Sequence, residues 1–271
     1  MSNEKQKPTE VSRRQFVGTV ATAAGVTIVP RHVLGAGFQA PSDTVNVGVV
    51  GYAHGMGTSN LLNMAKSDNI VALCDCDVSA AAREARKQRG TIDKFPKAAE
   101  HKDFRVMLEK QKDIDAVLVA TPDHTHAVIA MAAMQLGKHV YVQKPLTRTV
   151  SEARALTEAA RKYKVVTQMG NQGHSEEGLR MMQEWLDAGA LGQVREVYCW
   201  TNRPIWPQGM PRPTDTLAVP DGLDWDLWIG PSPMRPFQKT YHPFGWRACQ
   251  DFGARAMGDM GCHVMDAAFP I

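Results

Sequence analysis

The sequence predicts an α/β fold with a doubly wound parallel sheet, and two observations support this prediction. From residue 44 to residue 170, short apolar segments rich in β-branched residues alternate with segments of helical character. The first apolar segment runs into a glycine-rich loop, after which helix-forming residues follow. Alternation of this kind places parallel strands in a central layer and helices on both of its faces.

The first predicted strand covers residues 44–50, and a helix is predicted over 58–66. The loop between them contains Gly51, Gly55 and Gly57. A strand, a glycine loop and a helix together direct backbone N–H groups and a helix N-terminus at a pyrophosphate. The spacing departs from GxGxxG, because Ala53 stands at the second position and the loop is one residue longer. By itself the loop is therefore weak evidence for a dinucleotide site.

The second predicted strand, residues 70–74, ends at Asp75, which lies 24 residues after Gly51. An acid about 20 residues after the first glycine is typical of a contact with the adenosine ribose. Its charge repels a 2′-phosphate, so NAD is favoured over NADP. Alternatively, Asp75 caps the helix predicted over 79–89, although Asp77 or Ser79 is better placed for that role.

Further helices are predicted over 104–111, 127–136 and 150–163, with strands over 114–120, 139–144 and 165–169. The loop 121–126 contains His124 and His126, of which one is expected to pack at the helix start. No metal site is predicted, because neither this pair nor Cys74-Asp75-Cys76 belongs to a larger Cys/His cluster. The five cysteines are too scattered for a disulfide framework.

Lys144 ends a predicted buried strand and precedes Pro145. A residue before proline is held in extended geometry, so this lysine does not belong to a helix. The carboxyl end of a strand in an open α/β sheet is where such sheets bind ligands. The alternative is a surface lysine at a turn.

The second half of the chain is less regular. A helix is predicted over 176–188, with Met181, Met182 and Trp185 packed as core, and residues 194–201 alternate as the first strand of a second sheet does. The Pro- and Trp-rich segment 203–236, with the aromatic and basic side chains of 241–247, is a candidate wall for a sugar site. The alternative is an arm that wraps a neighbouring subunit.

Taken in order, these motifs resemble the Gfo/Idh/MocA family of nicotinamide-dependent oxidoreductases. The resemblance rests on the glycine loop and on the segments 72–75, 120–126, 137–145, 170–174, 202–209 and 258–263. It implies a NAD-binding Rossmann domain over 41–170. A C-terminal domain with a mostly antiparallel sheet, for substrate binding and oligomerisation, would begin at 171, and its part in this chain is 171–271.

The resemblance also implies residue roles. Lys144, Asp259 and His263 correspond to the catalytic residues of the family, in which the imidazole takes the hydroxyl proton and the lysine holds the oxygen. Asp259 and His263 are four residues apart and share one helix face; the alternative is a contact that only stabilises the helix. The implied cofactor-binding residues are Gly51, Gly55, Gly57, Asp75, Thr121, Pro122, His126, Gln143, Lys144 and Asn171.

Two departures from the family pattern affect these expectations. Gln143 stands where the motif has glutamate, which removes a negative charge beside Lys144. The chain also ends eight residues after His263, whereas family members are much longer. We therefore expect a C-terminally truncated chain that lacks most of the second sheet, and the activity of this chain itself stays open.

The N-terminal segment carries the charge imbalance. Of the net charge of +3, residues 1–40 contribute five basic and two acidic groups, and the remainder is balanced. No basic face for nucleic acid or anionic membrane is predicted, so a small-molecule partner is favoured. Arg13 and Arg14 precede a weakly apolar run, residues 16–29, that is shorter than the ~20 residues of a membrane span. This pattern resembles a twin-arginine signal and predicts export, for example to the periplasm; the alternative is a chance arginine pair.

The leading hypothesis is an exported oxidoreductase that transfers hydride between a sugar, cyclitol or polyol hydroxyl and tightly bound NAD. Its expected partners are the small-molecule substrate, the twin-arginine export machinery and, for the full-length protein, further copies of itself. Two other classes stay open: a glycoside hydrolase that uses NAD transiently, and a non-catalytic cofactor-binding protein.

Overall fold

The computed structural model describes residues 44–91, 93–206, 208–209 and 211–269. The predicted export segment lies outside these residues. No helix in the described part of the chain is both long enough and apolar enough to cross a membrane.

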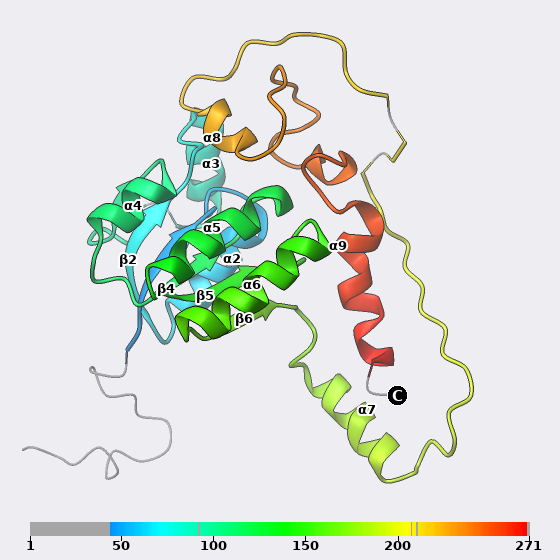
Figure 1. The fold of residues 1–271 in the computed structure, drawn as a ribbon. Coiled ribbons are helices and arrows are strands. Elements are labelled where there is room, and N and C mark those ends of the chain that lie inside the picture. The colour runs from blue at the N-terminus through cyan, green and yellow to red at the C-terminus, as the bar shows by residue number, and fades with distance from the viewer. Residues whose placement is uncertain (1–43, 92, 207, 210, 270–271) are drawn as a thin grey trace, which may run out of the picture. The chain divides into compact units, whose positions relative to one another are not determined.

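The described chain is built on a six-stranded parallel sheet (Figure 1). Its strand order is β3-β2-β1-β4-β5-β6, so the chain starts in the middle of the sheet and builds outward in both directions. The strands are β1 (Asn46–Val50), β2 (Asn69–Cys74), β3 (Ala99–His101), β4 (Ala116–Val119), β5 (His139–Gln143) and β6 (Thr167–Gly170). The strands predicted between residues 44 and 169 are all present, and the short β3 was missed because its three residues show no apolar pattern.

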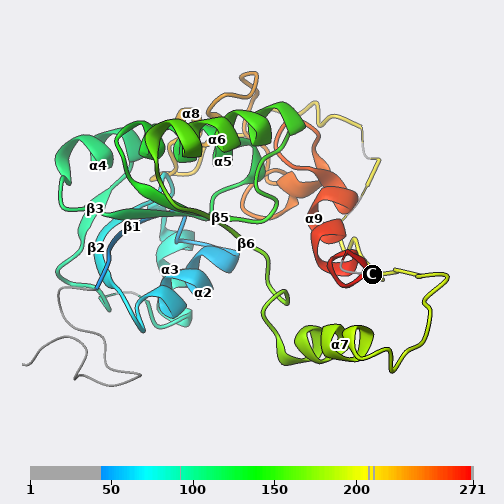
Figure 2. The same ribbon diagram turned by 60° about the horizontal axis from the view of Figure 1, so that its bottom comes forward.

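Helices cover both faces of the sheet. Figure 2 shows α4 (Phe104–Lys110), α5 (Asp123–Gln135) and α6 (Val150–Tyr163) on one side of it, and α2 (Gly55–Met64) and α3 (Ala80–Gln88) on the other. The doubly wound prediction is therefore confirmed. Ser79, one of the two residues favoured for the role, caps α3 by accepting the Ala82 N–H at 3.3 Å.

Two hydrophobic cores form on the two faces. Neighbouring residues of β1 belong to different cores: Val49 packs with Leu61 of α2, and Val50 packs with Ile129 of α5. Side chains alternate along a strand, so a strand buried on both faces must be apolar at nearly every position. This explains why these strands are continuous apolar runs rather than alternating ones.

After β6 the chain forms short helices joined by long irregular segments. The helices are α7 (Glu177–Asp187), α8 (Trp225–Ile229) and α9 (Arg255–Val264), with 3₁₀ turns at Gly245–Ala248 and Asp266–Ala268. Eight residues between 223 and 252 pack into a third hydrophobic cluster, which we call the aromatic cluster: Leu223, Trp225, Trp228, Ile229, Phe237, Tyr241, Trp246 and Phe252.

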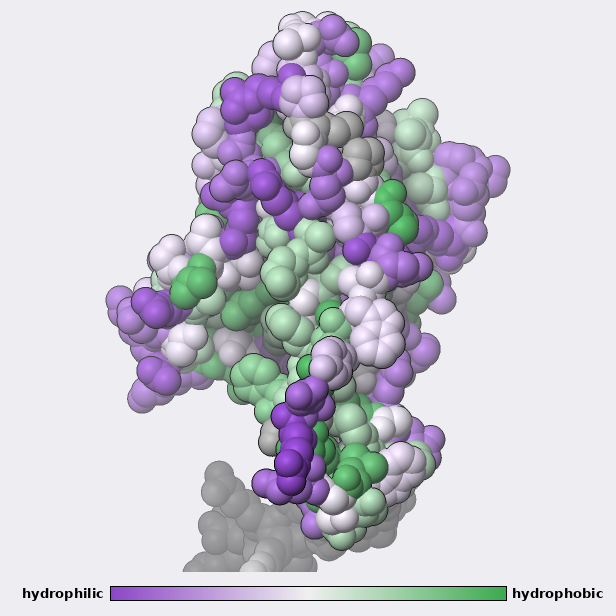
Figure 3. All heavy atoms as spheres, turned by 90° about the vertical axis from the view of Figure 1, so that its right-hand side faces the viewer, coloured by the Kyte–Doolittle hydropathy of each residue, from purple (hydrophilic) through white to green (hydrophobic). Residues whose placement is uncertain are grey.

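The predicted strand over 194–201 is not formed. These residues have no regular secondary structure, and Tyr198 and Trp200 are 74% and 81% exposed. A strand needs a neighbour to complete its backbone hydrogen bonds, and no strand follows Gly170 in the described chain. The prediction that Met181 and Trp185 of α7 pack in a core is also wrong, because both side chains are exposed. Figure 3 shows hydrophobic residues open to solvent on one face of the molecule.

Candidate functional site

Five of the predicted site residues lie just after the carboxyl ends of parallel strands. Gly51 follows β1, Asp75 follows β2, Thr121 follows β4, Lys144 follows β5 and Asn171 follows β6. Parallel strands end at the same edge of a sheet, and in open α/β sheets ligands bind at this edge.

The glycine loop is tightly packed. Gly51 has φ +85°, and a Cβ atom there would lie 2.7 Å from the Ala120 backbone. A Cβ atom on Gly57 would lie 1.8 Å from the Gly51 carbonyl oxygen. Only glycine allows the first turn of α2 to approach the end of β1 so closely. Gly55 has φ +56° but open space around it, so its requirement is conformational.

The start of α2 is suited to an anion. His54 is the N-cap residue and makes no capping bond with its side chain, and the first turn contains no acidic residue. Backbone N–H groups at a helix start and the helix dipole both favour negative charge. A dinucleotide pyrophosphate fits this position.

Asp75 accepts hydrogen bonds from the glycine loop and from the loop that follows β2. Its Oδ2 accepts the Ala53 N–H at 2.7 Å, and its Oδ1 accepts the Asp77 N–H at 3.0 Å. Burial raises the pKa of the Asp75 carboxyl, and these two N–H donors partly oppose that shift. Asp75 thus ties the ends of β1 and β2 together, and its contact with a ribose stays a prediction.

Two buried polar atoms beside Lys144 fit a ligand. The Gln143 side-chain oxygen accepts bonds from Lys144 N at 2.7 Å and from Gln172 Nε2 at 2.9 Å. Gln143 Nε2 and Asn171 Oδ1 are buried and have no partner among the described residues. An unpaired buried donor and acceptor cost free energy unless a ligand or water satisfies them. A bound nicotinamide cofactor is consistent with these groups.

The loop after β4 is fixed from inside the protein. Thr121 Oγ1 accepts a bond from Thr125 at 2.8 Å, and Pro122 is the N-cap residue of α5. His126 is 1% exposed, and its two ring nitrogens lie 2.8 Å from the carbonyl oxygens of Thr121 and Pro145. Both ring nitrogens therefore face the loops after β4 and β5, and a contact of His126 with a cofactor stays a prediction.

His124 is also buried, with its ring nitrogens at 3.1 Å and 2.9 Å from the carbonyl oxygens of Phe252 and Trp228. Both histidines pack at the start of α5, whereas the sequence predicted one. Burial lowers the pKa of His124 to about 4, so the ring is neutral near neutral pH.

The central feature of the site is the contact between Lys144 and α9. The Lys144 Nζ atom lies 2.9 Å from Asp259 Oδ1 and 2.8 Å from the Asp259 carbonyl oxygen. Both side chains are nearly buried, at 12% and 10% exposure. Residues 115 apart in sequence thus meet, and Asp259 supplies a carboxylate beside the lysine even though Gln143 is neutral.

His263 lies one turn further along α9. Its Nδ1 is 3.1 Å from the Gln172 carbonyl oxygen, which can only accept a hydrogen bond. In the neutral ring Nδ1 therefore carries the proton and Nε2 keeps its lone pair. This is the tautomer that a general base requires.

Two further charged residues lie at this site: Arg247, which was predicted as part of a sugar-site wall, and Asp123, for which no role was predicted. Arg247 Nε is 3.6 Å from Asp259 Oδ1, and its guanidinium lies over the rings of Trp246 and Phe244. Burial lowers the pKa of Arg247, and Asp259 opposes this shift. Asp123 accepts the Ala254 N–H at 2.9 Å, just before α9, and burial raises the pKa of its carboxyl. Asp123 lies within the predicted loop 121–126, which was the available signal.

The aromatic residues expected to wall a sugar site are mostly core. Trp225 and Trp228 stack with ring centroids 4.6 Å apart, and Trp246 and Tyr241 are also buried in the aromatic cluster. Their faces contact other aromatic rings and are not open to a sugar. Of the segment 203–236, the part before residue 221 is largely exposed and lacks regular structure.

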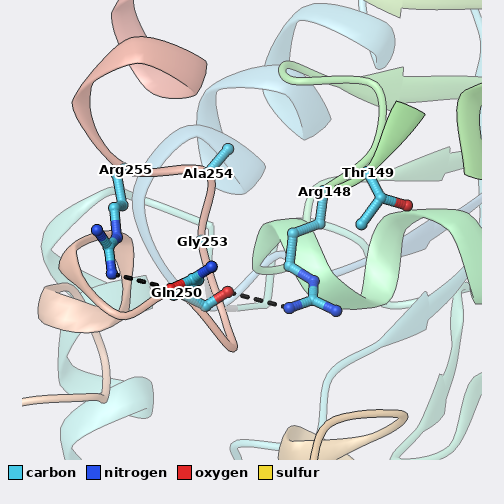
Figure 4. A pocket seen from close by; sticks show the side chains of 6 residues that line it. All are labelled: Arg148, Thr149, Gln250, Gly253, Ala254 and Arg255. Carbon is cyan, nitrogen blue, oxygen red and sulfur yellow. Dashed lines mark hydrogen bonds between the residues drawn. The ribbon is translucent and has the colours of Figure 1, made fainter. Parts of the chain in front are cut away.

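A hollow lies between the starts of α6 and α9, lined by Arg148, Thr149, Gln250, Gly253, Ala254 and Arg255. Figure 4 shows that both arginines point at Gln250. Arg148 donates to its carbonyl oxygen at 3.0 Å, and Arg255 donates to its side-chain oxygen at 3.2 Å. These contacts tie the loop after β5 to the segment before α9.

Comparison with known proteins places this site in context. Residues 45–171 match the Gfo/Idh/MocA oxidoreductase family model for the NAD-binding Rossmann fold. Residues 198–270 match the model for the C-terminal α/β domain of the same family. The oxidoreductase domain protein from Kribbella flavida has a similar structure, with a TM-score of 0.57 and 27% identity over 84% of this chain and 53% of that one.

Curated relatives have several functions. Levoglucosan dehydrogenase of Pseudarthrobacter phenanthrenivorans is 28% identical over 171 residues, which cover 61% of this chain and 35% of the relative. Inositol 2-dehydrogenase of Salmonella typhimurium is 26% identical over 156 residues, which cover 57% and 43%. A glycosyl hydrolase family 109 protein of Saccharopolyspora erythraea is 29% identical over 215 residues, which cover 72% and 46%.

The chain spans about half or less of the length of these curated relatives. The two family models nevertheless match consecutive parts of it, in the order in which the family has them. The six-stranded parallel sheet agrees with the first of these models. The chain therefore belongs to the Gfo/Idh/MocA family of oxidoreductases, and its first domain has the family's NAD-binding Rossmann fold.

Proposed function

We propose that the protein is an NAD-dependent oxidoreductase that transfers hydride between a hydroxyl-bearing carbon of a sugar, cyclitol or polyol and a tightly bound nicotinamide. The observation that carries this proposal is the Lys144–Asp259 pair at the carboxyl end of β5, 2.9 Å apart and nearly buried. A lysine so placed is held in one position and keeps its charge balanced by the carboxylate.

The residues of this chain divide the work as follows. Bound NAD would supply the hydride acceptor. The Lys144 ammonium would hold the substrate oxygen and stabilise the negative charge that develops on it. His263 Nε2 would take the hydroxyl proton, because Nδ1 is occupied by the Gln172 carbonyl oxygen. Asp259 would hold the Lys144 ammonium in position through its carboxylate and carbonyl oxygens.

The substrate class rests on the relatives. Levoglucosan dehydrogenase and inositol 2-dehydrogenases carry names that state an anhydrosugar and a cyclitol as substrates. Both compounds present several secondary hydroxyls on a ring. We therefore propose a ring polyol or sugar as the substrate of this protein.

The test compares Lys144→Met with Lys138→Met, which replaces a partly exposed lysine just before the amino end of the same strand. Both variants would be assayed for reduction of the nicotinamide with levoglucosan, inositols and common sugars. We expect Lys144→Met to lower kcat/KM by about 10²- to 10³-fold and Lys138→Met to leave it unchanged. Cofactor content, measured by mass spectrometry after denaturation, should be equal in both. Wild-type protein that binds cofactor but oxidises none of these compounds would overturn the proposal.

A second candidate is an NAD-dependent glycoside hydrolase. The similarity to a glycosyl hydrolase family 109 protein extends over 72% of this chain. Such an enzyme would release an aglycone from a chromogenic glycoside without net reduction of the nicotinamide. Aglycone release that Lys144→Met abolishes would favour this candidate, and net cofactor reduction would favour the first.

We further propose export through the twin-arginine pathway, on the basis of Arg13, Arg14 and the weakly apolar residues after them. That pathway carries folded proteins, so the enzyme would cross with its cofactor already bound. Homo-oligomerisation through the C-terminal domain is proposed from the family resemblance. Cell fractionation and light scattering of the purified protein test these two points.

A further inference from the structure

Three side chains from distant parts of the sequence converge beside the glycine loop. His54 is the N-cap residue of α2, Asp77 lies between β2 and α3, and His242 lies in the segment between α8 and α9. His54 Nε2 is 2.8 Å from Asp77 Oδ2, and His242 Nε2 is 3.2 Å from the same oxygen. One ligand atom from each residue lies within 4.8 Å of the other two.

The carboxylate at the centre of this group needs a positive partner. The Asp77 side chain is 2% exposed, and in the described chain its only ionic partners are these two imidazoles. A buried carboxylate without a partner is strongly unfavourable. The ionised carboxylate is therefore stabilised by the N–H groups of Ser79 and of the imidazoles or, where the imidazoles act as ligands, by a bound cation.

The surroundings hold the three groups in position. Asp77 Oδ1 accepts the Ser79 N–H at 2.9 Å, which directs Oδ2 at the imidazoles. The His242 ring contacts the rings of Trp228 and His54 edge-on, with centroids 6.0 Å and 5.3 Å apart. Partners of this kind orient the ligands in metal sites. The side chain of His54 is 26% exposed, so solvent reaches the group from that side.

The spacing and the ligand types fit one class of ion. Tetrahedral bonds of 2.0–2.1 Å place neighbouring ligand atoms about 3.3 Å apart. The His242–Asp77 separation of 3.2 Å matches this value, and the His54–Asp77 separation of 2.8 Å is shorter and would lengthen on metal binding. Two imidazole nitrogens and one carboxylate oxygen suit zinc, whereas magnesium and calcium prefer sites made of oxygen atoms. Three protein ligands leave a fourth position for water.

We propose that His54, Asp77 and His242 form a binding site for a divalent transition-metal ion, with zinc as the best match. The ion would join the glycine loop and the loop after β2 to the segment that carries the aromatic cluster. None of the three residues has a role in the proposed hydride or proton transfer, and the zinc test below needs no cofactor; His54 nevertheless begins the helix at which the pyrophosphate is expected.

The experiment uses tag-free protein freed of metal with a chelator and titrated with zinc alone by calorimetry, with bound zinc counted by elemental analysis. We expect one zinc per chain. His54→Ala and His242→Ala should each weaken binding by more than about 100-fold, because even outer-shell changes cost 10–100-fold. His54→Ala is the safer variant for folding, since its side chain makes no capping bond. Zinc should also raise the unfolding temperature of the wild type and not that of the variants.

His174→Ala is the matched control. His174 also contacts a carboxylate at 2.9 Å, that of Asp266, but no second histidine joins that pair among the described residues. Zinc binding should be unchanged in this variant. Cobalt in place of zinc should give the intense visible bands of a four-coordinate site. Absence of stoichiometric zinc binding, or equal binding in wild type and His54→Ala, would show a metal-free imidazole–carboxylate cluster and overturn the proposal.

Discussion

The two halves of the described chain achieve order in different ways. Residues 45–170 form a sheet whose central strands are buried on both faces, with a hydrophobic core on each side. The described residues between 171 and 269 form no sheet, and all of their buried apolar residues except Trp206 gather in the aromatic cluster. Outside that cluster, large apolar side chains such as Trp200 and Phe269 are exposed. Regular hydrogen bonding orders the first half, whereas side-chain packing orders the second locally.

The aromatic cluster also depends on the loops of the first half. Asp224 N donates to the Cys76 carbonyl oxygen at 2.9 Å, and His124 contacts the carbonyl oxygens of Trp228 and Phe252. Asp123 and Lys144 hold the start and the middle of α9. The loops that form the cofactor edge are therefore the same loops that position the catalytic candidates on α9.

Phe252→Ala is expected to have the largest effect, and it tests most directly whether side-chain packing orders the second half. The Phe252 side chain is 0% exposed, and its ring lies 4.9–5.1 Å from those of His124, Trp228 and Tyr241. Truncation of a buried phenylalanine costs about 3–5 kcal/mol. Hydrogen exchange should accelerate over residues 221–264 and stay slow in β1 and β4. Phe269→Ala, at a site that is 92% exposed, should change stability by less than about 0.5 kcal/mol.

Equal acceleration in both halves would contradict the comparison, because it would mean that the described chain unfolds as one cooperative unit.

Two glycines within helices, one in each half, provide a further test of the difference between the halves. A Cβ atom on Gly57 in α2 would lie 1.8 Å from the Gly51 carbonyl oxygen, so Gly57→Ala should destabilise the protein by about 3 kcal/mol and weaken NAD binding. Gly178 in α7 has no atom within 4 Å of such a Cβ atom. Gly178→Ala should therefore stabilise α7 by up to about 1 kcal/mol. Urea unfolding and cofactor titration measure both. If Gly57→Ala changes neither the stability nor the NAD binding of the protein, α2 does not approach the end of β1 closely.

A pH dependence of stability is also expected where the two halves meet. His124 has a pKa of about 4 in the folded protein because it is buried, against an ordinary value of 6.5. The unfolded chain therefore binds a proton first as pH falls, and stability is lost between pH 6.5 and 4. The total loss is at most about 3.4 kcal/mol, because each pKa unit corresponds to 1.36 kcal/mol. Above pH 6.5 the contribution is fully present.

Urea unfolding of wild type and His124→Asn across this pH range isolates the effect. The variant should be less stable above pH 6.5 and should lose less stability on acidification. Parallel curves for the two proteins would show that another group is responsible.

Much of the first half could be predicted from the sequence because its signals are local. Apolar runs of strand length, the glycine loop and the Lys144–Pro145 step indicate their own structure without knowledge of distant residues. The same approach was misleading for residues 194–201, where the alternating pattern is real but no neighbouring strand is present to complete it. The pattern of a strand shows its preference, and pairing decides whether it forms.

The sequence alone predicts the parallel α/β sheet, the position of Lys144 at the edge of the sheet where ligands bind, and the family to which the chain belongs. Three contacts are seen in the tertiary structure and not in the sequence. Lys144 meets Asp259, the two ring nitrogens of His126 face carbonyl oxygens, and His54, Asp77 and His242 converge. The physical reason is that strand and helix periodicity are encoded in near neighbours. Contacts between side chains on different strands and loops, some of them more than a hundred positions apart, depend instead on strand order and loop paths.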